Sequence, residues 1–289
     1  MNALKSLYML LAPLTLMAVI VYAIYQLVAS PFDFAWVAVL LTALPLMVFL
    51  MGVMIFQNKP RTHDYLPVHS LVVALGMAMI LVLFIIPSLQ SNVKLNTMSL
   101  VLAEISTAIY ILYLFWYSSL GRVANTKLAL GRALPEFKVY DEEQEINSAS
   151  FKGKPLVLIF YRGNWCPFCV AQIKELAKDY QELSLQGVKF LLISPQPEYQ
   201  TKAIAKKFNV PFTFLSDLGN FTAKQLGIYH KNGLPTGMNI LGYNSDTVYP
   251  TVIVTNSKGE VIYLNETNSF RDRPDPMEYL PLIADKKAA

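Results

Sequence analysis

The only two cysteines of this 289-residue chain are Cys166 and Cys169, which follow Trp165 directly in the stretch IFYRGNWCPFCVAQIKEL. Thiols at this spacing on a helix lie on the same face, one turn apart. A thiolate at one position can attack a disulfide or a peroxide, and the thiol at the other can then close an intramolecular disulfide. The pair therefore points to thiol redox chemistry.

The surroundings of the pair indicate how it is activated. The apolar run PLVLIFY precedes it and is typical of a buried parallel strand, whereas a helical period begins at Cys166. Unpaired amide groups at a helix start stabilise a thiolate, and Pro167 suits the first turn because proline has no amide proton. We expect Cys166 to be exposed and activated, and Cys169 to be shielded and resolving.

Two other interpretations of the pair remain open. Half a zinc site is one, although the chain has no second cysteine pair and its histidines are distant in sequence. Two inert core cysteines are the other, because free cysteines are commonly buried. A C-x-x-C pair where a strand gives way to a helix favours the redox interpretation over both.

The elements that must position the pair begin after about Gly121, where charged residues and turn formers replace long apolar runs. Strands are expected in an edge hairpin between 137 and 146, in PLVLIFY, in Val188 to Ser194, and in two strands around the NSKGE turn, with a short apolar segment PFTFLSD. Helices are expected after the cysteines, over about 199–208 and 221–226, and from Pro276 to Ala284. This alternation predicts an α/β domain with a mixed sheet.

The first part of the chain has a different character. The chain is 54% hydrophobic and only 15% charged, and four apolar runs each reach the length of about 20 residues that crosses a bilayer. They are Leu7–Val28, Phe34–Phe56, Val68–Leu89 and Met98–Tyr117. We therefore predict a four-helix transmembrane domain over 1–122 and a soluble α/β domain over 123–289. The first run is too long for a signal peptide and is expected to be retained.

The lysines and arginines beside these runs predict the orientation. Lys5, Lys59, Arg61, Arg122, Lys127 and Arg132 fall on one side of four spans, against Lys94 on the other. This count predicts a multi-pass protein of the inner (cytoplasmic) membrane with a cytoplasmic soluble domain. Glu104, inside the fourth run, is a candidate functional residue or an interface residue. His63 and His69 are weak candidates for haem or metal ligands.

The soluble half resembles a known family. VLIFYRGNWCPFCVAQIKEL is similar to the active-site segment of peroxiredoxin-like proteins of the alkyl hydroperoxide reductase and thiol-specific antioxidant type, within the thioredoxin superfamily. The likeness continues through LLISPQPEYQTKAIAKKFNVPFTFLSDLGNFTAKQLGI to FRDRPDPMEYL, so it covers roughly Gly131 to Ile283. The resemblance implies a thioredoxin fold with Cys166 as nucleophile and Cys169 as its partner. It also implies a cis-proline at Pro250, for which an ordinary strand-start proline is the alternative.

The chain departs from this family at three points. Peroxiredoxins have a Thr or Ser three residues before the attacking cysteine, where this chain has Gly163 before Cys166 and Cys166 itself before Cys169. They also deliver an arginine from a later strand, but DTVYPTVIV contains none, so Arg162 either substitutes for it or is a solvated charge. Thioredoxins usually hold a buried acid six residues before the first cysteine, whereas this chain has Phe160.

Three functions are consistent with these observations. The leading hypothesis is a membrane-anchored thiol-disulfide oxidoreductase that uses the Cys166–Cys169 pair. A thiol-dependent peroxidase at the membrane surface is the runner-up, and a non-catalytic binding or assembly module is the third function. No nucleotide-binding motif is visible, so we expect no cofactor in the chain and electrons from a separate thiol reductant or a quinone. Membrane lipid, a disulfide substrate protein and a peroxide are the expected partners. A net charge of +4 without a basic stripe argues against nucleic-acid binding.

Overall fold

A computed structural model of the chain describes residues 2–29, 31–88, 97–184, 187–208, 210 and 212–284. Two compact units make up the chain. One consists mainly of Ala3–Phe56 and Thr62–Ser118, and the other mainly of Gln57–Arg61 and Ser119–Ala289. Lys94 and Leu89, which the orientation count and the third apolar run include, lie outside the described residues.

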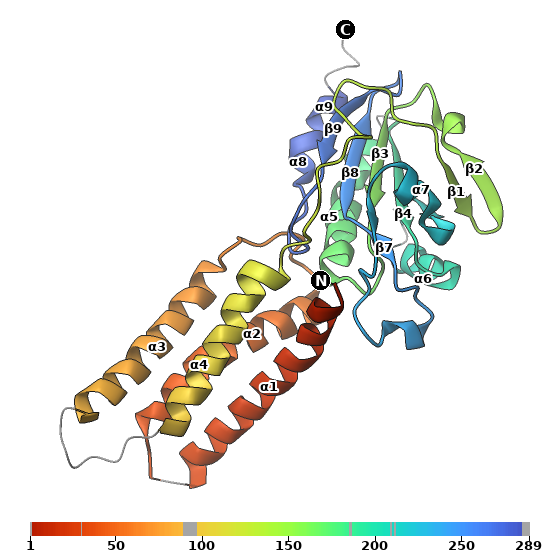
Figure 1. Cartoon of the computed structure of the whole chain (residues 1–289). Helices are drawn as coiled ribbons and strands as arrows, with labels where there is room; N and C mark the ends of the chain where they lie inside the picture. The colour runs from red at the N-terminus through yellow and green to blue at the C-terminus, as the bar shows by residue number, and fades with distance from the viewer. Residues whose placement is uncertain are drawn as a thin grey trace. The chain divides into compact units, whose positions relative to one another are not determined.

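The first unit consists of helices α1 Asn2–Ala29, α2 Phe34–Phe56, α3 Pro67–Ser88 and α4 Thr97–Leu112, which a short π-helix, η1 Tyr113–Tyr117, continues (Figure 1). Four described segments are long and apolar enough to cross a membrane, from Ala3 to Ala29, Phe34 to Phe56, Pro67 to Ile85 and Thr97 to Tyr117. They coincide with the four predicted runs. Many of their large apolar side chains are exposed, which is the pattern of helices that face lipid.

A glycine lets two of these helices approach closely. A Cβ added to Gly76 of α3 would lie 2.8 Å from Leu41 Cβ and 3.0 Å from the carbonyl oxygen of Ala38, both on α2. Small residues at helix contacts are the usual way for helices to pack in lipid, where water does not drive them together.

The second unit is built on a seven-stranded sheet in the order β2-β1-β5-β4-β3-β8-β9 (Figure 1). Its strands are β1 Lys138–Asp141, β2 Gln144–Asn147, β3 Leu156–Phe160, β4 Lys189–Ser194, β5 Thr213–Ser216, β8 Thr251–Thr255 and β9 Val261–Asn265. The β3–β4 and β4–β5 pairs are parallel, and the other pairs are antiparallel. The predicted mixed sheet, including the edge hairpin, is therefore confirmed. Two further strands, β6 Tyr229–His230 and β7 Thr247–Val248, form a small separate sheet.

Strand β3 lies in the interior of the sheet because both of its faces are apolar. All five of its residues, Leu156 to Phe160, are buried, with β4 on one side and β8 on the other. Burying a large apolar side chain stabilises the fold by roughly 1.5–3 kcal/mol. A continuous apolar run of this kind is stable only inside a sheet. The place of β3 in the sheet therefore fixes where the chain leaves the strand, just before the cysteine pair.

Helices α5 Pro167–Ser184, α6 Glu198–Phe208 and α7 Phe221–Gln225 connect the strands, and α8 Pro276–Tyr279 and α9 Pro281–Ala284 follow β9. Short 3-10 helices occur at η2 Ser148–Phe151, η3 Leu218–Asn220 and η4 Met238–Leu241. The prediction of a single last helix is wrong, because α8 and α9 are separate. Pro281 has no amide proton, and its ring clashes with the preceding turn, so the helix ends before it.

Candidate active site

The cysteine pair lies at the start of α5, just beyond the carboxyl end of β3. The amide of Cys166 donates a hydrogen bond to the carbonyl of Gly163 (3.2 Å), and the Cys166 carbonyl accepts the first helical bond from Val170 (3.0 Å). Pro167 is the first helical residue and Cys169 the third. The predicted place of the pair at a strand-to-helix junction is confirmed. Ligands of open α/β sheets usually bind at this end of the strands.

Both sulfurs are shielded from solvent. Cys166 is 2% exposed and Cys169 is 0% exposed, so the expectation that Cys166 is exposed is wrong. A segment about a hundred residues further along the chain lies against the pair. Phe270 contacts the ring of Phe168 in α5 at 6.1 Å between ring centroids, and Arg273 contacts both sulfurs. The sequence at the pair itself does not reveal this cover.

Arg273 is the closest charged group to the pair. One of its nitrogens, Nη2, lies 3.2 Å from Cys169 Sγ and 3.7 Å from Cys166 Sγ. Its other terminal nitrogen donates to the carbonyls of Phe270 and Asp272, which hold the guanidinium in place. The side chain is only 1% exposed. A cation buried against sulfur needs a negative partner, and a thiolate is the group that supplies one.

The two thiols differ in their tendency to ionise. For Cys169, burial would raise the pKa, but the hydrogen bond with Cys166, the charge of Arg273 and the Arg162 amide together lower that pKa well below the usual cysteine value. For Cys166, burial and the hydrogen bond to Cys169 raise the pKa well above the usual value. The charge of Arg273 lowers the pKa of both thiols, and Cys169 is the sulfur nearer to that charge. The role of Cys166 as the activated thiol stays a prediction.

Arg162 and Trp165 form one wall of the site. The guanidinium of Arg162 lies 4.7 Å from the centre of the Trp165 ring, and its Nη2 donates to the carbonyl of Gly233. Arg162 is half-buried, so it is not a freely solvated charge, but Arg273 and not Arg162 donates side-chain hydrogen bonds to the sulfurs. The charge of Arg162 does help to lower the pKa of Cys166 against the larger effect of burial.

Gly163 has a structural reason to stand where peroxiredoxins have a hydroxyl residue. Its φ is +149°, and a Cβ at this position would lie 2.5 Å from Trp165 Nε1. Side chains rarely adopt this backbone conformation. The close approach of the Trp165 indole to Gly163 thus disfavours a threonine or serine there.

Pro250 lies between β7 and β8, and its peptide bond is trans, so the predicted cis-proline is wrong. The trans form is the favoured one even for proline. Its carbonyl accepts a hydrogen bond from Arg122, whose side chain is only 5% exposed and also pairs with Glu266.

A polar network lies next to the Trp165 wall. The Asn164 amide donates to Gln196 Oε1 (2.8 Å), its side chain donates to Gln200 (2.6 Å), and Tyr243 donates its hydroxyl proton to Asn164 Oδ1. Tyr243 belongs to residues 231–246, the segment between β6 and β7, which also contacts Arg162. This segment lies against Trp165. The cavity between them has a volume of only about 10 Å³, about the least that can hold one water molecule.

The remaining candidates lie away from the pair in sequence. Glu104 is an exposed residue of α4 in the first unit, and His63 and His69 also belong to that unit. Among the residues that the structure describes, no group of three or more His, Cys, Asp or Glu side chains could hold a metal ion.

Sequence reasoning missed Arg273. The stretch FRDRPDPMEYL belongs to the region that resembles the family, so two arginines close together there were a visible signal. Which of them would reach the sulfurs depends on how the chain returns past β9.

Known proteins resemble the second unit. Residues 130–264 match the AhpC/TSA family model. The chain is 36% identical over 112 residues to "Peroxiredoxin Q, chloroplastic" of Populus jackii, which is 38% of this chain and 53% of that protein. It is 35% identical over 103 residues to the protein of the same name from Sedum lineare, covering 35% and 55%. The chain thus spans about half the length of these relatives.

Among solved structures, the reduced 2-Cys peroxiredoxin of Plasmodium vivax is similar over 55% of this chain and 82% of its own, at 22% identity and a TM-score of 0.45. The family match falls on the region that holds the cysteine pair and the sheet. Residues 130–264 of the second unit are therefore similar to peroxiredoxins of the AhpC/TSA type.

Proposed function

We propose that this protein is a membrane-anchored thiol-dependent peroxidase in which Cys169 attacks the peroxide and Cys166 resolves the product. The observation that carries this proposal is the buried Arg273 guanidinium 3.2 Å from Cys169 Sγ. A cation at this position stabilises the thiolate and can donate to a peroxide oxygen. It supplies the arginine that the sequence lacks at the strand where the family has it.

The chemistry balances with these two thiols and an external reductant. The Cys169 thiolate attacks one peroxide oxygen, an S–O bond forms, the O–O bond breaks, and the departing oxygen takes a proton and leaves as water or an alcohol. The Cys166 thiol then attacks the Cys169 sulfenic acid, so that an S–S bond forms and water leaves. A separate dithiol reduces this disulfide by exchange and becomes oxidised itself.

A thiol-disulfide oxidoreductase is the second candidate, because the two thiols are hydrogen-bonded to each other and can form one intramolecular disulfide. The residue at the position where thioredoxins usually hold a buried acid, six before the first cysteine, argues against this second function. Phe160 is 1% exposed and packs in the core against Phe137, so it offers no proton acceptor. The similarity to the AhpC/TSA family also favours the peroxidase.

Single cysteine variants of the full-length protein test the proposal. We expect Cys169→Ser to consume no hydrogen peroxide or organic hydroperoxide, and Cys166→Ser to consume one equivalent and stop. In Cys166→Ser, a sulfenic acid at Cys169 should be trapped by dimedone and detected by mass spectrometry. Trapping at Cys166 in Cys169→Ser instead would reverse the assignment.

The same preparation separates the other two functions. Wild-type protein that reduces disulfide substrates but turns over no peroxide would support the oxidoreductase. A non-catalytic module is supported if replacing both cysteines by serine leaves the cellular phenotype unchanged. In the proposed function, that double variant loses peroxide resistance.

The four apolar helices of the first unit support anchoring in a membrane. We infer that they hold the peroxidase domain close to lipid, where hydroperoxides of acyl chains form. A separate thiol reductant on the same side of the membrane completes the cycle, and a quinone between the helices is a further electron source to test.

A further inference from the structure

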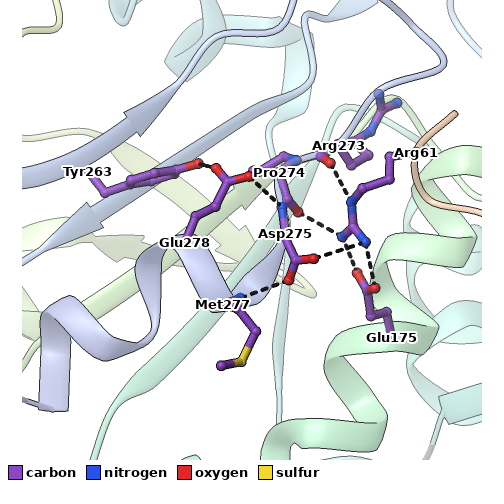
Figure 2. Close-up of polar contacts among 8 residues, drawn as sticks. All are labelled: Arg61, Glu175, Tyr263, Arg273, Pro274, Asp275, Met277 and Glu278. Carbon is purple, nitrogen blue, oxygen red and sulfur yellow. Dashed lines mark hydrogen bonds and ion pairs between the residues drawn. The ribbon is translucent and has the colours of Figure 1, made fainter. Parts of the chain in front are cut away.

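A second arginine, Arg61, binds the backbone of Arg273, the arginine that contacts the sulfurs. Arg61 comes from the stretch Gln57–Arg61 between α2 and α3, which is part of the second unit. Figure 2 shows its guanidinium between α5 and the chain that follows β9. This stretch lies outside the region that resembles peroxiredoxins.

The contacts of Arg61 use almost its whole guanidinium. Its terminal nitrogens bind both carboxylate oxygens of Glu175 at 2.9 and 2.6 Å, and Nη1 lies 3.5 Å from Asp275 Oδ2. Its Nε donates to the carbonyl of Arg273 (3.0 Å), and Nη2 donates to the carbonyl of Pro274 (3.1 Å) (Figure 2). A planar fork with five donors fits this arrangement, whereas the single ammonium of lysine does not.

These contacts join the two elements that bring thiolate and cation together. Glu175 is on α5, six residues after Cys169. The carbonyls that accept hydrogen bonds from Arg61 belong to Arg273 and Pro274. Arg61 thus bridges the helix that carries the thiolate and the backbone that carries the cation. A displacement of that backbone by 1 Å would already weaken a contact of 3.2 Å between guanidinium and sulfur.

The bridge is more than an exposed surface ion pair, which stabilises proteins by little. The side chains of Arg61 and Glu175 are only 31% and 26% exposed. Asp275 is also fixed, because its carboxylate caps α8 by accepting a hydrogen bond from the backbone amide of Met277 (2.9 Å). Glu278 completes the capping box. The backbone from Arg273 to Asp275 is therefore held on one side by α8 and on the other by Arg61.

We propose that Arg61 is a positioning residue: it holds the Arg273 backbone against α5 so that the Arg273 guanidinium stays on the Cys169 sulfur. The inference rests on the proposed role of Arg273. It makes the stretch between α2 and α3 a working part of the thiol site. Arg61 itself touches neither sulfur and takes no part in the chemical step.

The test measures the pH dependence of Cys169 alkylation by iodoacetamide in the full-length protein in detergent, with the modified peptide quantified by mass spectrometry. The charged groups near the sulfurs are Arg273 and Arg162, and neither is changed by Arg61→Gln. We expect Arg61→Gln to raise the pH midpoint of alkylation, by less than the roughly 1–3 units expected when the cation itself is removed. Arg61→Lys should also raise this midpoint, because lysine keeps the positive charge but lacks the planar set of donors of the guanidinium.

Arg132→Gln is the matched control, because Arg132 is an exposed arginine of the same unit. We expect its midpoint to equal that of the wild type. A midpoint in Arg61→Gln that equals that of Arg132→Gln would overturn the inference. Glu175→Gln provides a second route if Arg61→Gln does not fold: it removes the α5 end of the bridge and should also raise the midpoint, and an unchanged midpoint there counts equally against the inference.

A double variant separates positioning from a general effect. In the Arg273→Gln background, Arg61→Gln should add no further shift, since the guanidinium that it positions is absent. An equal shift in both backgrounds would show that Arg61 acts by another route and would overturn the inference. If Arg273→Gln alone left the midpoint unchanged, the proposed thiolate site would fail together with this inference, whereas a shift in Arg273→Gln without one in Arg61→Gln would refute only the role of Arg61.

Discussion

At the scale of single residues, the site depends on where one negative charge is placed between two nearly equivalent sulfurs. Cys169 is the third residue of α5, where backbone amides still lack helical partners, and it is 0.5 Å closer to Arg273 than Cys166 is, as the two distances of 3.2 and 3.7 Å show. In the proposed function, Cys166 lies three residues earlier and donates a hydrogen bond to the Cys169 thiolate.

Removing the cation should therefore change the ionisation of Cys169. We expect Arg273→Gln to raise the pKa of the Cys169 thiol by roughly 1–3 units, because an opposite charge at this distance favours the ionised form by about that amount. At neutral pH the thiolate fraction falls, so peroxide consumption slows and regains its rate only as the pH is raised. Arg273→Lys, which keeps a positive charge, should shift the pH profile less; equal profiles for wild type and Arg273→Gln would contradict the assignment.

Gly163 is the second residue whose identity the geometry dictates. We expect Gly163→Ala to destabilise the domain by about 1–3 kcal/mol, because its Cβ would lie 2.5 Å from Trp165 Nε1 and the backbone would keep a φ of +149°. Thermal unfolding measures this change. Gly153→Ala is a suitable comparison: its φ is also positive, but nothing lies within 4 Å of an added Cβ, so a larger loss there than at Gly163 would argue against the steric explanation.

At the scale of elements, the segment 231–246 between β6 and β7 lies against the Trp165 side of the site. Its contacts with Arg162 and Asn164 leave a cavity of only about 10 Å³ beside Trp165. We expect this segment or Trp165 to move when a hydroperoxide enters. Loops that bind substrate are commonly drawn from the less stable parts of a fold.

Weakening one anchor of this segment should make the thiols more accessible. We expect Tyr243→Phe, which removes the hydroxyl that binds Asn164, to increase the rate at which a bulky maleimide labels the cysteine pair, with little change in thermal stability. Tyr140→Phe is the control, because it removes a tyrosine hydroxyl that binds Glu145 in the β1–β2 hairpin. If both variants label at the wild-type rate, the segment does not limit access.

At the scale of the whole molecule, the proposed anchoring in a membrane raises the question of the side on which the second unit lies. The sequence count places it in the cytoplasm, but two of the counted charges also have structural partners. Arg61 pairs with Glu175 and Arg122 with Glu266, so their positive charges do not serve orientation alone. The cytoplasmic placement stays a prediction.

Two introduced cysteines can test it in a chain whose native pair is replaced by serine, since the buried native thiols label poorly. Ser257→Cys places an exposed thiol in the β8–β9 turn, and Phe32→Cys places one between α1 and α2, where Phe32 is 64% exposed. With a membrane-impermeant maleimide on spheroplasts, we expect labelling of Phe32→Cys before permeabilisation and of Ser257→Cys only after it. The opposite pattern would put the domain on the outer side.

The amino-acid sequence by itself determined the features that depend on local patterns. Long apolar runs can be stable only in lipid or in a large core, so four helices could be read from them, and the alternation of apolar strands with amphipathic helices was enough for an α/β domain with a mixed sheet. The C-x-x-C spacing at the end of a buried strand likewise located the thiol site, because a helix must begin there.

Only the tertiary structure decided what surrounds the sulfurs. Arg273 is more than 100 residues from the pair in sequence, and Arg61 is more than 100 residues from Glu175 on the other side, so no local period connects them. Burial of both thiols, the closer approach of Arg273 to Cys169 and the trans bond at Pro250 all follow from how these distant segments pack. Electrostatic free energies depend on distance in space and on exclusion of water, and neither quantity is encoded at the motif itself.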